Sequence, residues 1–330
     1  MGETGSDLRA VDILRKGREA LVAELGKVIV GQAEVIDHVL MALFCEGHSL
    51  IVGVPGLAKT LMVRTIARIL DLEFRRIQFT PDLMPSDIVG TEFIQEDSST
   101  GRRDLRFVKG PVFANVILAD EINRTPPKTQ AALLEAMEER RVTVAGKGYD
   151  LPAPFFVLAT QNPIEQEGTY PLPEAQLDRF MFHIWIDYPS IPEECDIVRA
   201  TTAEQKVELG KVLTSEQVKD IQQVVRRIPV SDAVIAQAVR LVAATRPTHE
   251  TAPEFVKKWV RWGAGPRASQ YIILGAKARA VVRGELSVSE SDVKAVAPAV
   301  LRHRIVVNFH AESEGVSSDD VVKKLLEDKV

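Results

Sequence analysis

The stretch that most constrains this chain is residues 49–61, where a short apolar run meets a glycine-rich loop. Residues 50–52 have the character of a buried strand, and apolar residues recur at helical spacing from Leu61 onward. The loop between them, residues 53–60, matches Gly-x-x-x-x-Gly-Lys-[Ser/Thr], with Ala58 in place of the second glycine. A strand, loop and helix of this kind bind phosphate, because backbone N–H groups and the helix N-terminus point at the anion.

Each position of the loop has an expected role at a bound nucleotide. Lys59 should reach the β- and γ-phosphate oxygens, and Thr60 should ligate Mg²⁺. The rest of the cradle consists of Gly53, Val54, Pro55, Gly56, Leu57, Ala58 and Leu61. A methyl group at Ala58 is tolerated if the backbone there stays in a helical region. A plain turn between a strand and a helix is the simpler alternative, but the flanking pattern is the one that the phosphate-binding motif needs.

Size and composition narrow the class of protein. A chain of 330 residues favours about two domains. Its 45% apolar and 26% charged residues are typical of a globular protein, and the net charge of −5 argues against a general nucleic-acid binder. No apolar run approaches the ~18–20 residues that span a bilayer. The N-terminus lacks the pattern of a secretory signal, and Cys45 and Cys195 lie far apart, so we expect a cytoplasmic protein without a membrane span.

Two further apolar runs end in polar side chains. Residues 115–121 read as a buried strand that ends in Asp120 and Glu121, and residues 155–160 as another strand that precedes Asn162. The carboxyl ends of parallel strands face the ligand crevice, so Asp120 should hold Mg²⁺ through water and Glu121 should act as a base. The alternatives are a carboxylate pair that caps the next helix, and an Asn-Pro turn at Asn162.

Two segments predict β-hairpins. Residues 91–108 alternate either side of a polar turn, and residues 142–151 are expected to turn near 146–148. The first segment carries a basic cluster: Arg102, Arg103, Arg106 and Lys109. This cluster is either a solvated face or a loop that contacts a partner.

The pattern changes after residues 187–192, which have the composition of a linker. The later part predicts helices near 193–205, 214–228, 231–245, 267–283 and 289–301, and an amphipathic helix near 7–26 opens the chain. Arg267 lies in the first turn of one of them. A cation there opposes the helix dipole, so either a phosphate or a nearby glutamate should account for its position.

The ordered motifs together resemble the AAA+ ATPases and, within them, the MoxR family. They are Gly53-Val-Pro-Gly-Leu-Ala-Lys-Thr60, Ala119-Asp-Glu-Ile-Asn-Arg124, Ala159-Thr-Gln-Asn-Pro163, Glu167-Gly-Thr-Tyr-Pro-Leu-Pro-Glu-Ala-Gln-Leu-Asp-Arg-Phe180 and the Gly-x-Gly-Pro-Arg that ends at Arg267. The resemblance covers roughly residues 10–310, and Ala58 is usual in this family. It implies an α/β fold over residues 1–188, with a five-stranded parallel sheet of order 5-1-4-3-2 between helices. It also implies an all-α lid domain over 189–330, and hairpins that point into the pore of a ring, usually a hexamer.

The resemblance also implies roles for single residues. Ile29, Val30 and Gly31 should pack on adenine; the loop is Walker A, and Asp120-Glu121 is Walker B. Asn162 corresponds to sensor 1. Arg179 corresponds to the arginine finger of a neighbouring subunit, and Arg267 to sensor 2, acting in cis or in trans. Gln78 corresponds to the residue that restrains Glu121.

The implied activity is hydrolysis of ATP with Mg²⁺, used for chaperone-like remodelling or activation of protein complexes. A separate partner with a von Willebrand factor A domain is expected. The alternative is a nucleic-acid-stimulated motor of the same AAA+ branch, since Lys147 is expected at a hairpin tip. A nucleotide-dependent switch that barely hydrolyses ATP is a third possibility, against which the complete set of catalytic residues argues.

Overall fold

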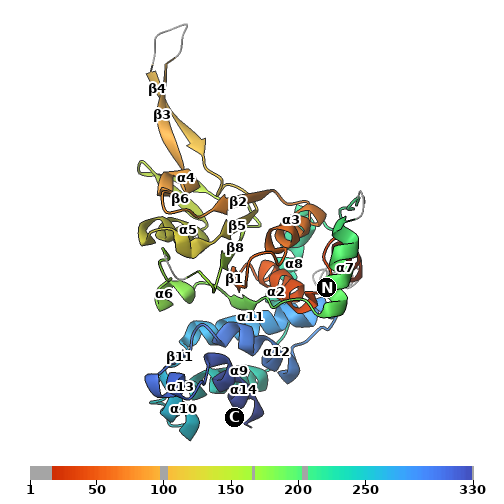
Figure 1. Ribbon diagram of the computed structural model, residues 1–330, viewed down its shortest axis with the longest axis vertical. Coiled ribbons are helices and arrows are strands. Elements are labelled where there is room, and N and C mark those ends of the chain that lie inside the picture. The colour runs from red at the N-terminus through yellow and green to blue at the C-terminus, as the bar shows by residue number, and fades with distance from the viewer. Residues whose placement is uncertain (1–16, 97–102, 166–167, 203–206, 329–330) are drawn as a thin grey trace.

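The computed structural model describes residues 17–96, 103–165, 168–202 and 207–328, and its centre is a five-stranded sheet (Figure 1). The strands are β1 (Ser49–Val52), β2 (Phe74–Gln78), β5 (Val116–Asp120), β8 (Phe156–Gln161) and β9 (Phe182–Trp185), in the order β2-β5-β8-β1-β9. All neighbouring strands are parallel. Counted in chain order within this sheet they run 2-3-4-1-5, which is 5-1-4-3-2 read from the other edge, so the predicted α/β class and sheet are confirmed.

The inner strands are apolar on both faces because helices cover both faces. Ile51 of β1 belongs to a core shared with α2 (Ala33–Phe44) and α3 (Lys59–Ile69). Leu50 and Val52, which point the other way, belong to a second core with α5 (Pro127–Glu139). The sheet therefore lies between two helical layers, as predicted.

The register of the sheet gives it two distinct edges. Ser49, at the start of β1, pairs with Phe182 at the start of β9, and Val52 at the end of β1 pairs with Gln161 at the end of β8. Gln78 and Asp120 pair at the ends of β2 and β5. The carboxyl ends of the strands thus share one edge of the sheet, and the amino ends share the other.

Both predicted hairpins are present. The first is β3 (Gly90–Glu96) with β4 (Arg103–Lys109), which follows α4 (Pro85–Val89) and projects from the body (Figure 1). Its tip, with Arg102, lies outside the described residues. The second is β6 (Arg141–Val144) with β7 (Lys147–Asp150). It turns at Ala145 and Gly146, where φ is 48° and 80°, one residue earlier than predicted.

The later part of the chain is mostly helical. Its helices are α7 (Ile191–Thr202), α8 (Ser215–Arg227), α9 (Asp232–Ala244), α10 (Glu254–Trp259), α11 (Pro266–Val282), α12 (Glu290–Leu301), α13 (Phe309–Ser313) and α14 (Ser318–Glu327). Helices α9 to α14 group at the end of the molecule opposite the first hairpin (Figure 1). The end of the predicted helix 193–205 and residues 7–16 of the first predicted helix lie outside the described residues, whereas residues 17–26 are helical.

The prediction of an all-α lid was wrong in one respect. β10 (Val260–Trp262) pairs with β11 (Val306–Val307) in a small antiparallel sheet. Strands of two or three residues are too short to show an alternation, and their partner lies more than 40 residues away, so no local pattern reveals them.

The position of α8 bears on the organisation of domains. This helix packs beside α2, and Gln222 donates a hydrogen bond from Nε2 to the carbonyl oxygen of Leu43 over 2.8 Å. A helix that follows residue 188 thus packs against a helix that precedes it, and a domain boundary after residue 188 stays a prediction. In the part of the chain that the structure describes, no helix is long and apolar enough to cross a membrane.

Candidate active site

The glycine-rich loop begins where β1 ends and leads directly into α3, which starts at Lys59. A Cβ atom at Gly53 would lie 2.8 Å from the carbonyl oxygen of Ile186, so glycine is required for this close approach. Ala58 has φ 54° and ψ 21°, in the left-handed region. The condition under which a methyl group was expected to be tolerated, an ordinary helical backbone, is therefore not met at Ala58. An alanine there stores roughly 1–2 kcal/mol of strain, which is common at functional sites.

Lys59 folds back over the loop. Its Nζ donates to the carbonyl oxygen of Gly53 over 2.5 Å. Partial burial lowers the pKa of Lys59, while the negative charges of Asp120 and Glu121 act to raise it. The ammonium group therefore lies at the loop and within the field of both carboxylates.

Asp120 is held at the end of β5 by two neighbouring strands. Thr160 of β8 donates from Oγ1 to Oδ1 of Asp120 over 2.6 Å. Arg76 of β2 donates to Oδ2 from Nε over 3.0 Å and from Nη2 over 2.6 Å. Neither Thr160 nor Arg76 was predicted. Arg76 and Gln78 stand two residues apart on one strand and so share a face, which is a sequence signal that could have identified Arg76.

Glu121 follows in a strained conformation, with φ 58° and ψ 50°. Its backbone N–H donates to Oγ1 of Thr160 over 2.9 Å. Its Oε2 accepts two hydrogen bonds, from Nε2 of Gln78 over 3.0 Å and from Nη1 of Arg124 over 2.9 Å. The structure thus places Gln78 against Glu121, and it adds Arg124, which sequence reasoning missed.

Asn162 lies just beyond the end of β8 and is 6% exposed. Its Oδ1 accepts the backbone N–H of Ile164 over 3.1 Å, so it forms the turn that was the alternative interpretation. The preceding residue, Gln161, accepts the N–H of Gly53 over 3.3 Å. Asn162 therefore comes directly after a residue that contacts the start of the glycine-rich loop. Its place in a turn does not conflict with a role at a bound nucleotide.

The segment predicted to pack on adenine lies beside the linker. Ile29 is buried and Val30 is half-buried. Gly31 has φ 68°, and a Cβ atom there would lie 2.3 Å from Oε1 of Glu193. The neighbouring Gln32 donates to the carbonyl oxygen of Asp187 over 3.3 Å.

The oxygen atoms at this edge fit a magnesium ion. Thr60 lies in the first turn of α3 and Asp120 ends β5, so a hydroxyl and a carboxylate are available. Mg²⁺ prefers such hard oxygen ligands, and it is commonly held by one or two protein groups together with phosphate oxygens and water.

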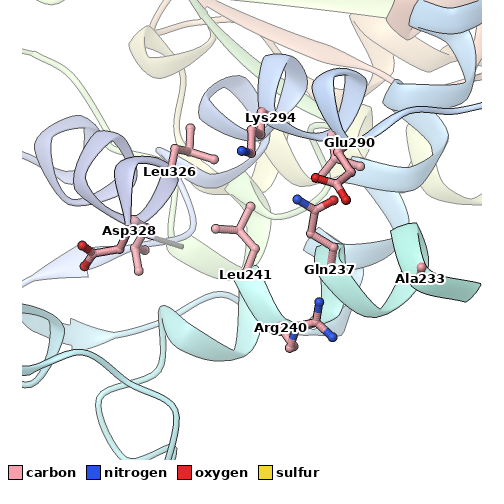
Figure 2. Close-up of a pocket in the computed structure, with 10 residues that line it drawn as sticks. Ala233, Gln237, Arg240, Leu241, Glu290, Lys294, Leu326 and Asp328 are labelled. Carbon is pink, nitrogen blue, oxygen red and sulfur yellow. The ribbon is translucent and has the colours of Figure 1, made fainter. Parts of the chain in front are cut away.

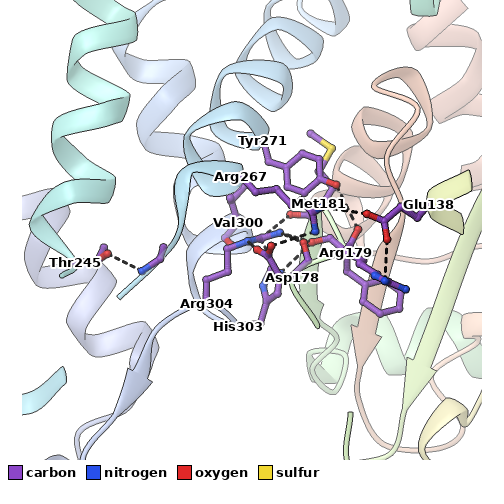
Figure 3. Close-up of polar contacts among 12 residues, drawn as sticks. Glu138, Asp178, Arg179, Met181, Thr245, Arg267, Tyr271, Val300, His303 and Arg304 are labelled. Atoms are coloured by element: carbon purple, nitrogen blue, oxygen red, sulfur yellow. Dashed lines mark hydrogen bonds and ion pairs between the residues drawn. The ribbon is translucent and has the colours of Figure 1, made fainter. Parts of the chain in front are cut away.

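Arg179 and Arg267 lie at the other edge of the sheet, where they share Glu138 (Figure 3). Nη2 of Arg179 lies 2.8 Å from Oε2 of Glu138, and Nη2 of Arg267 lies 3.3 Å from Oε1. Both arginines line a cavity of ≈ 190 Å³ with His48, which precedes β1. The four residues of β1, roughly 13 Å in length, separate this cavity from the chain's own glycine-rich loop. The glutamate that was the alternative explanation for Arg267 is therefore present.

Arg304, which the sequence did not single out, joins this cluster to the lid. It is buried, and it donates from Nε to Oδ1 of Asp178 over 2.7 Å and from Nη2 to the carbonyl oxygens of Asp178 and Phe180, each over 2.7 Å. Oδ2 of Asp178 accepts from Nη1 of Arg267 over 3.2 Å. Burial lowers the pKa of Arg304, and Asp178 opposes that shift. The turn that carries Arg179 is thus bound to Arg304, which lies in the chain between α12 and β11 (Figure 3).

A separate cavity of ≈ 520 Å³ lies within the lid, between α9, α12 and the end of α14 (Figure 2). Gln237, Arg240, Glu290 and Lys294 line it together with apolar side chains such as Leu241. None of its described lining residues belongs to the predicted site.

Comparison with known proteins agrees with this geometry. Residues 48–182 match the model of the ATPase family associated with various cellular activities (AAA), and residues 254–325 match the AAA lid domain. Chaperone MoxR1 of Mycobacterium tuberculosis is 44% identical over 312 residues, which are 94% of this chain and 81% of that protein. Protein MoxR of Methylorubrum extorquens is 31% identical over 86% of this chain and 85% of its own length.

A solved structure extends the likeness to the whole fold. The crystal structure of a proposed ATPase from Cytophaga hutchinsonii superposes with a TM-score of 0.91 at 40% identity, covering 99% of this chain and 98% of the other. The family models cover both parts of the chain, and the relatives extend over nearly all of it. The chain therefore belongs to the MoxR family of AAA+ ATPases.

Proposed function

We propose that this protein hydrolyses ATP in sites shared between neighbouring copies in a ring, and that hydrolysis drives chaperone-like remodelling of other proteins. The observation that carries the proposal is the division of the predicted catalytic residues between two edges of one sheet. Lys59, Asp120 and Glu121 lie at the carboxyl edge, whereas Arg179 and Arg267 lie at the amino edge beside Glu138. One copy therefore holds two halves of two different sites.

The carboxyl edge would bind the nucleotide. The loop from Gly53 to Leu61 would hold the phosphates with its backbone N–H groups. Lys59 would donate to a phosphate oxygen instead of to the carbonyl oxygen of Gly53. Residues 29–31 would pack on the base. Thr60 and, through water, Asp120 would hold Mg²⁺, which when bound neutralises phosphate charge.

Glu121 is the group proposed to activate water. Its carboxylate would accept a proton from a water in line with the γ-phosphate, and the amide of Asn162 would help to orient that water. Gln78 and Arg124 both donate to Oε2 of Glu121, which draws this oxygen toward β2 and away from such a role. We therefore assign Gln78 a restraining role that a partner or a rearrangement of the site would relieve.

The amino edge would serve the next copy. Arg179 and Arg267 cannot reach the chain's own loop across the sheet, so both would act in trans on a neighbour's γ-phosphate. An arginine finger is typically worth about 10³–10⁵ in rate. We assign Arg267 to action in trans because it pairs with Glu138 and Asp178, beside the proposed arginine finger Arg179.

The projecting hairpin is the proposed contact for a client. Four large apolar side chains are exposed on it, namely Phe93, Ile94, Leu105 and Val108. Two of its cations are engaged within the chain: Arg106 donates to Gln95 over 3.1 Å, and Lys109 lies 5.0 Å from the ring centre of Phe113. The exposed apolar side chains support a protein client over a nucleic acid.

The assembly and the setting are proposed with the function. We propose a hexameric ring in the cytoplasm, with a von Willebrand factor A domain protein as partner, and a division into an AAA+ domain of residues 1–188 and a lid of residues 189–330. Free thiols at the buried Cys45 and the exposed Cys195 are in keeping with a reducing compartment. The name of the relative Chaperone MoxR1 supports the chaperone-like use.

Mixing of two inactive variants tests the shared site. Lys59→Ala removes the nucleotide half, and Arg179→Ala removes the finger half, so each variant alone should lack turnover. In a mixture, some sites combine a normal loop with a normal finger, and ATPase activity should return. Size-exclusion chromatography with ATP shows whether the two variants assemble. Mixtures that co-assemble but stay inactive would overturn action in trans.

A further inference from the structure

Arg76 touches both halves of the Walker B apparatus. Its Nε and Nη2 donate to Oδ2 of Asp120, the proposed metal carboxylate, over 3.0 and 2.6 Å. The same Nη2 also donates to Oε1 of Gln78. A single guanidinium group on β2 thus connects the carboxylate that would face Mg²⁺ to the amide that restrains Glu121.

This contact sets which end of the Gln78 amide faces Glu121. A glutamine amide has an oxygen that only accepts and a nitrogen that only donates. Since Arg76 holds the oxygen, the nitrogen is turned toward Glu121, where it donates to Oε2 over 3.0 Å. Without Arg76 the amide would have no fixed direction, and its oxygen would repel the carboxylate of Glu121 whenever it turned that way.

We propose that Arg76 is a positioning residue that couples magnesium at Asp120 to the release of Glu121. This proposal rests on the proposed ATPase function. A divalent cation near Asp120 repels the guanidinium group and competes with it for the same carboxylate. The side chain of Arg76 is 47% exposed, so it can withdraw into solvent. Its withdrawal frees the amide of Gln78, and Glu121 loses one of the two donors on Oε2.

The remaining donor keeps the release partial. Arg124 still donates to Oε2 of Glu121 over 2.9 Å, and its Nε lies 3.7 Å from Glu165. Arrival of the metal therefore loosens Glu121 without freeing it, which leaves a second step for a partner or a neighbouring copy. In this arrangement, nucleotide without metal leaves the restraint in place.

The experiment measures magnesium binding apart from turnover. A fluorescent ADP analogue is bound to the full chain in EDTA and then titrated with Mg²⁺. Arg76→Ala removes the competitor for Asp120, so the half-saturating Mg²⁺ concentration should fall at least about fivefold, the lower end of typical coupling between sites. Affinity for the analogue in EDTA should stay at the wild-type value. Basal ATPase activity at saturating Mg²⁺ should rise.

Three further variants separate charge from geometry. Arg76→Lys keeps a cation for Asp120 but lacks the planar fork that also reaches Gln78, so it should keep the wild-type Mg²⁺ requirement and still raise basal turnover. Gln78→Ala should raise turnover without changing that requirement. Arg75→Ala is the matched control, because the neighbouring Arg75 pairs with Glu73 over 3.0 Å on the strand's other side and should change neither quantity.

The outcomes divide clearly. A half-saturating Mg²⁺ concentration in Arg76→Ala that is unchanged or higher, with normal binding in EDTA, overturns the coupling. If Arg76→Ala does not fold, Arg76→Lys decides: a basal rate equal to wild type overturns the role of the fork. Failure of the wild-type chain to bind the analogue would instead contradict the proposed function.

Discussion

The amide nitrogen of Gln78 lies 3.0 Å from Oε2 of Glu121, across the two neighbouring strands β2 and β5. The hydrogen bond joins residues 43 positions apart in the chain. It reaches the carboxylate that we propose as the base, and it draws that carboxylate toward β2.

Gln78→Ala should raise the basal rate of ATP hydrolysis. The variant removes one donor from Oε2 of Glu121, and the loss of a hydrogen bond of about 1 kcal/mol corresponds to about a fivefold increase. The measurement is steady-state phosphate release at saturating ATP without a client. Glu121→Gln in the same background should bind ATP but show no turnover. A slower Gln78→Ala enzyme with normal ATP binding would show that Gln78 assists catalysis and does not restrain it.

Glu138→Gln should lower kcat about tenfold, equivalent to about 1.4 kcal/mol of barrier. Glu138 pairs with Arg179 over 2.8 Å and with Arg267 over 3.3 Å. Its negative charge therefore keeps the two positively charged side chains next to each other, in the position from which we propose that they act. The half-exposed pairs add little stability, so the free energy of unfolding should change by less than about 1 kcal/mol. ATP affinity should not change, because the nucleotide half is untouched.

The matched control for that variant is Glu139→Gln, which alters the adjacent, exposed carboxylate at the end of α5. It should keep the wild-type kcat. An equal loss in both variants would mean that general surface charge, rather than the hold on the two arginines, determines the rate. A higher kcat in Glu138→Gln would mean that Glu138 sequesters the arginines.

His183→Phe should make stability less dependent on pH. Burial lowers the pKa of His183 to about 3 from its usual 6.5, and in the described part of the chain neither ring nitrogen has a hydrogen-bond partner. As the pH falls below 6.5, the unfolded chain takes up a proton at this site and the folded chain does not, so the free energy of unfolding decreases. Between pH 7.5 and 5.5 the loss at this site is about 1.4 kcal/mol.

Urea unfolding at the two pH values measures the difference. The wild-type protein should lose about 1.4 kcal/mol more than His183→Phe does. His48, whose pKa burial lowers to about 4, should contribute a similar loss in both proteins. Equal losses in the two proteins would show that His183 is protonated in the folded state at pH 5.5.

Residues that form one continuous segment were predicted well. The loop from Gly53 to Thr60, the strand that ends in Asp120 and Glu121, and both hairpins were placed correctly because their patterns lie within short windows. The left-handed backbone at Ala58 was not predicted, since a sequence does not show backbone angles. The β10–β11 pair was missed because neither strand has enough residues to show a period.

The sequence by itself determined the family, the sheet and the residues of the proposed nucleotide half of the site, because a glycine-rich loop and a strand that ends in two carboxylates each encode their geometry locally. Only the tertiary structure decided that Arg179 and Arg267 meet at Glu138 on the far edge, and that Arg76 joins Asp120 to Gln78. Glu138 lies 41 positions from Arg179 and 129 positions from Arg267, and Arg76 lies 44 positions from Asp120. The register of the strands and the packing of the lid on the sheet determine these contacts, and neither can be read from the spacing of residues in the chain.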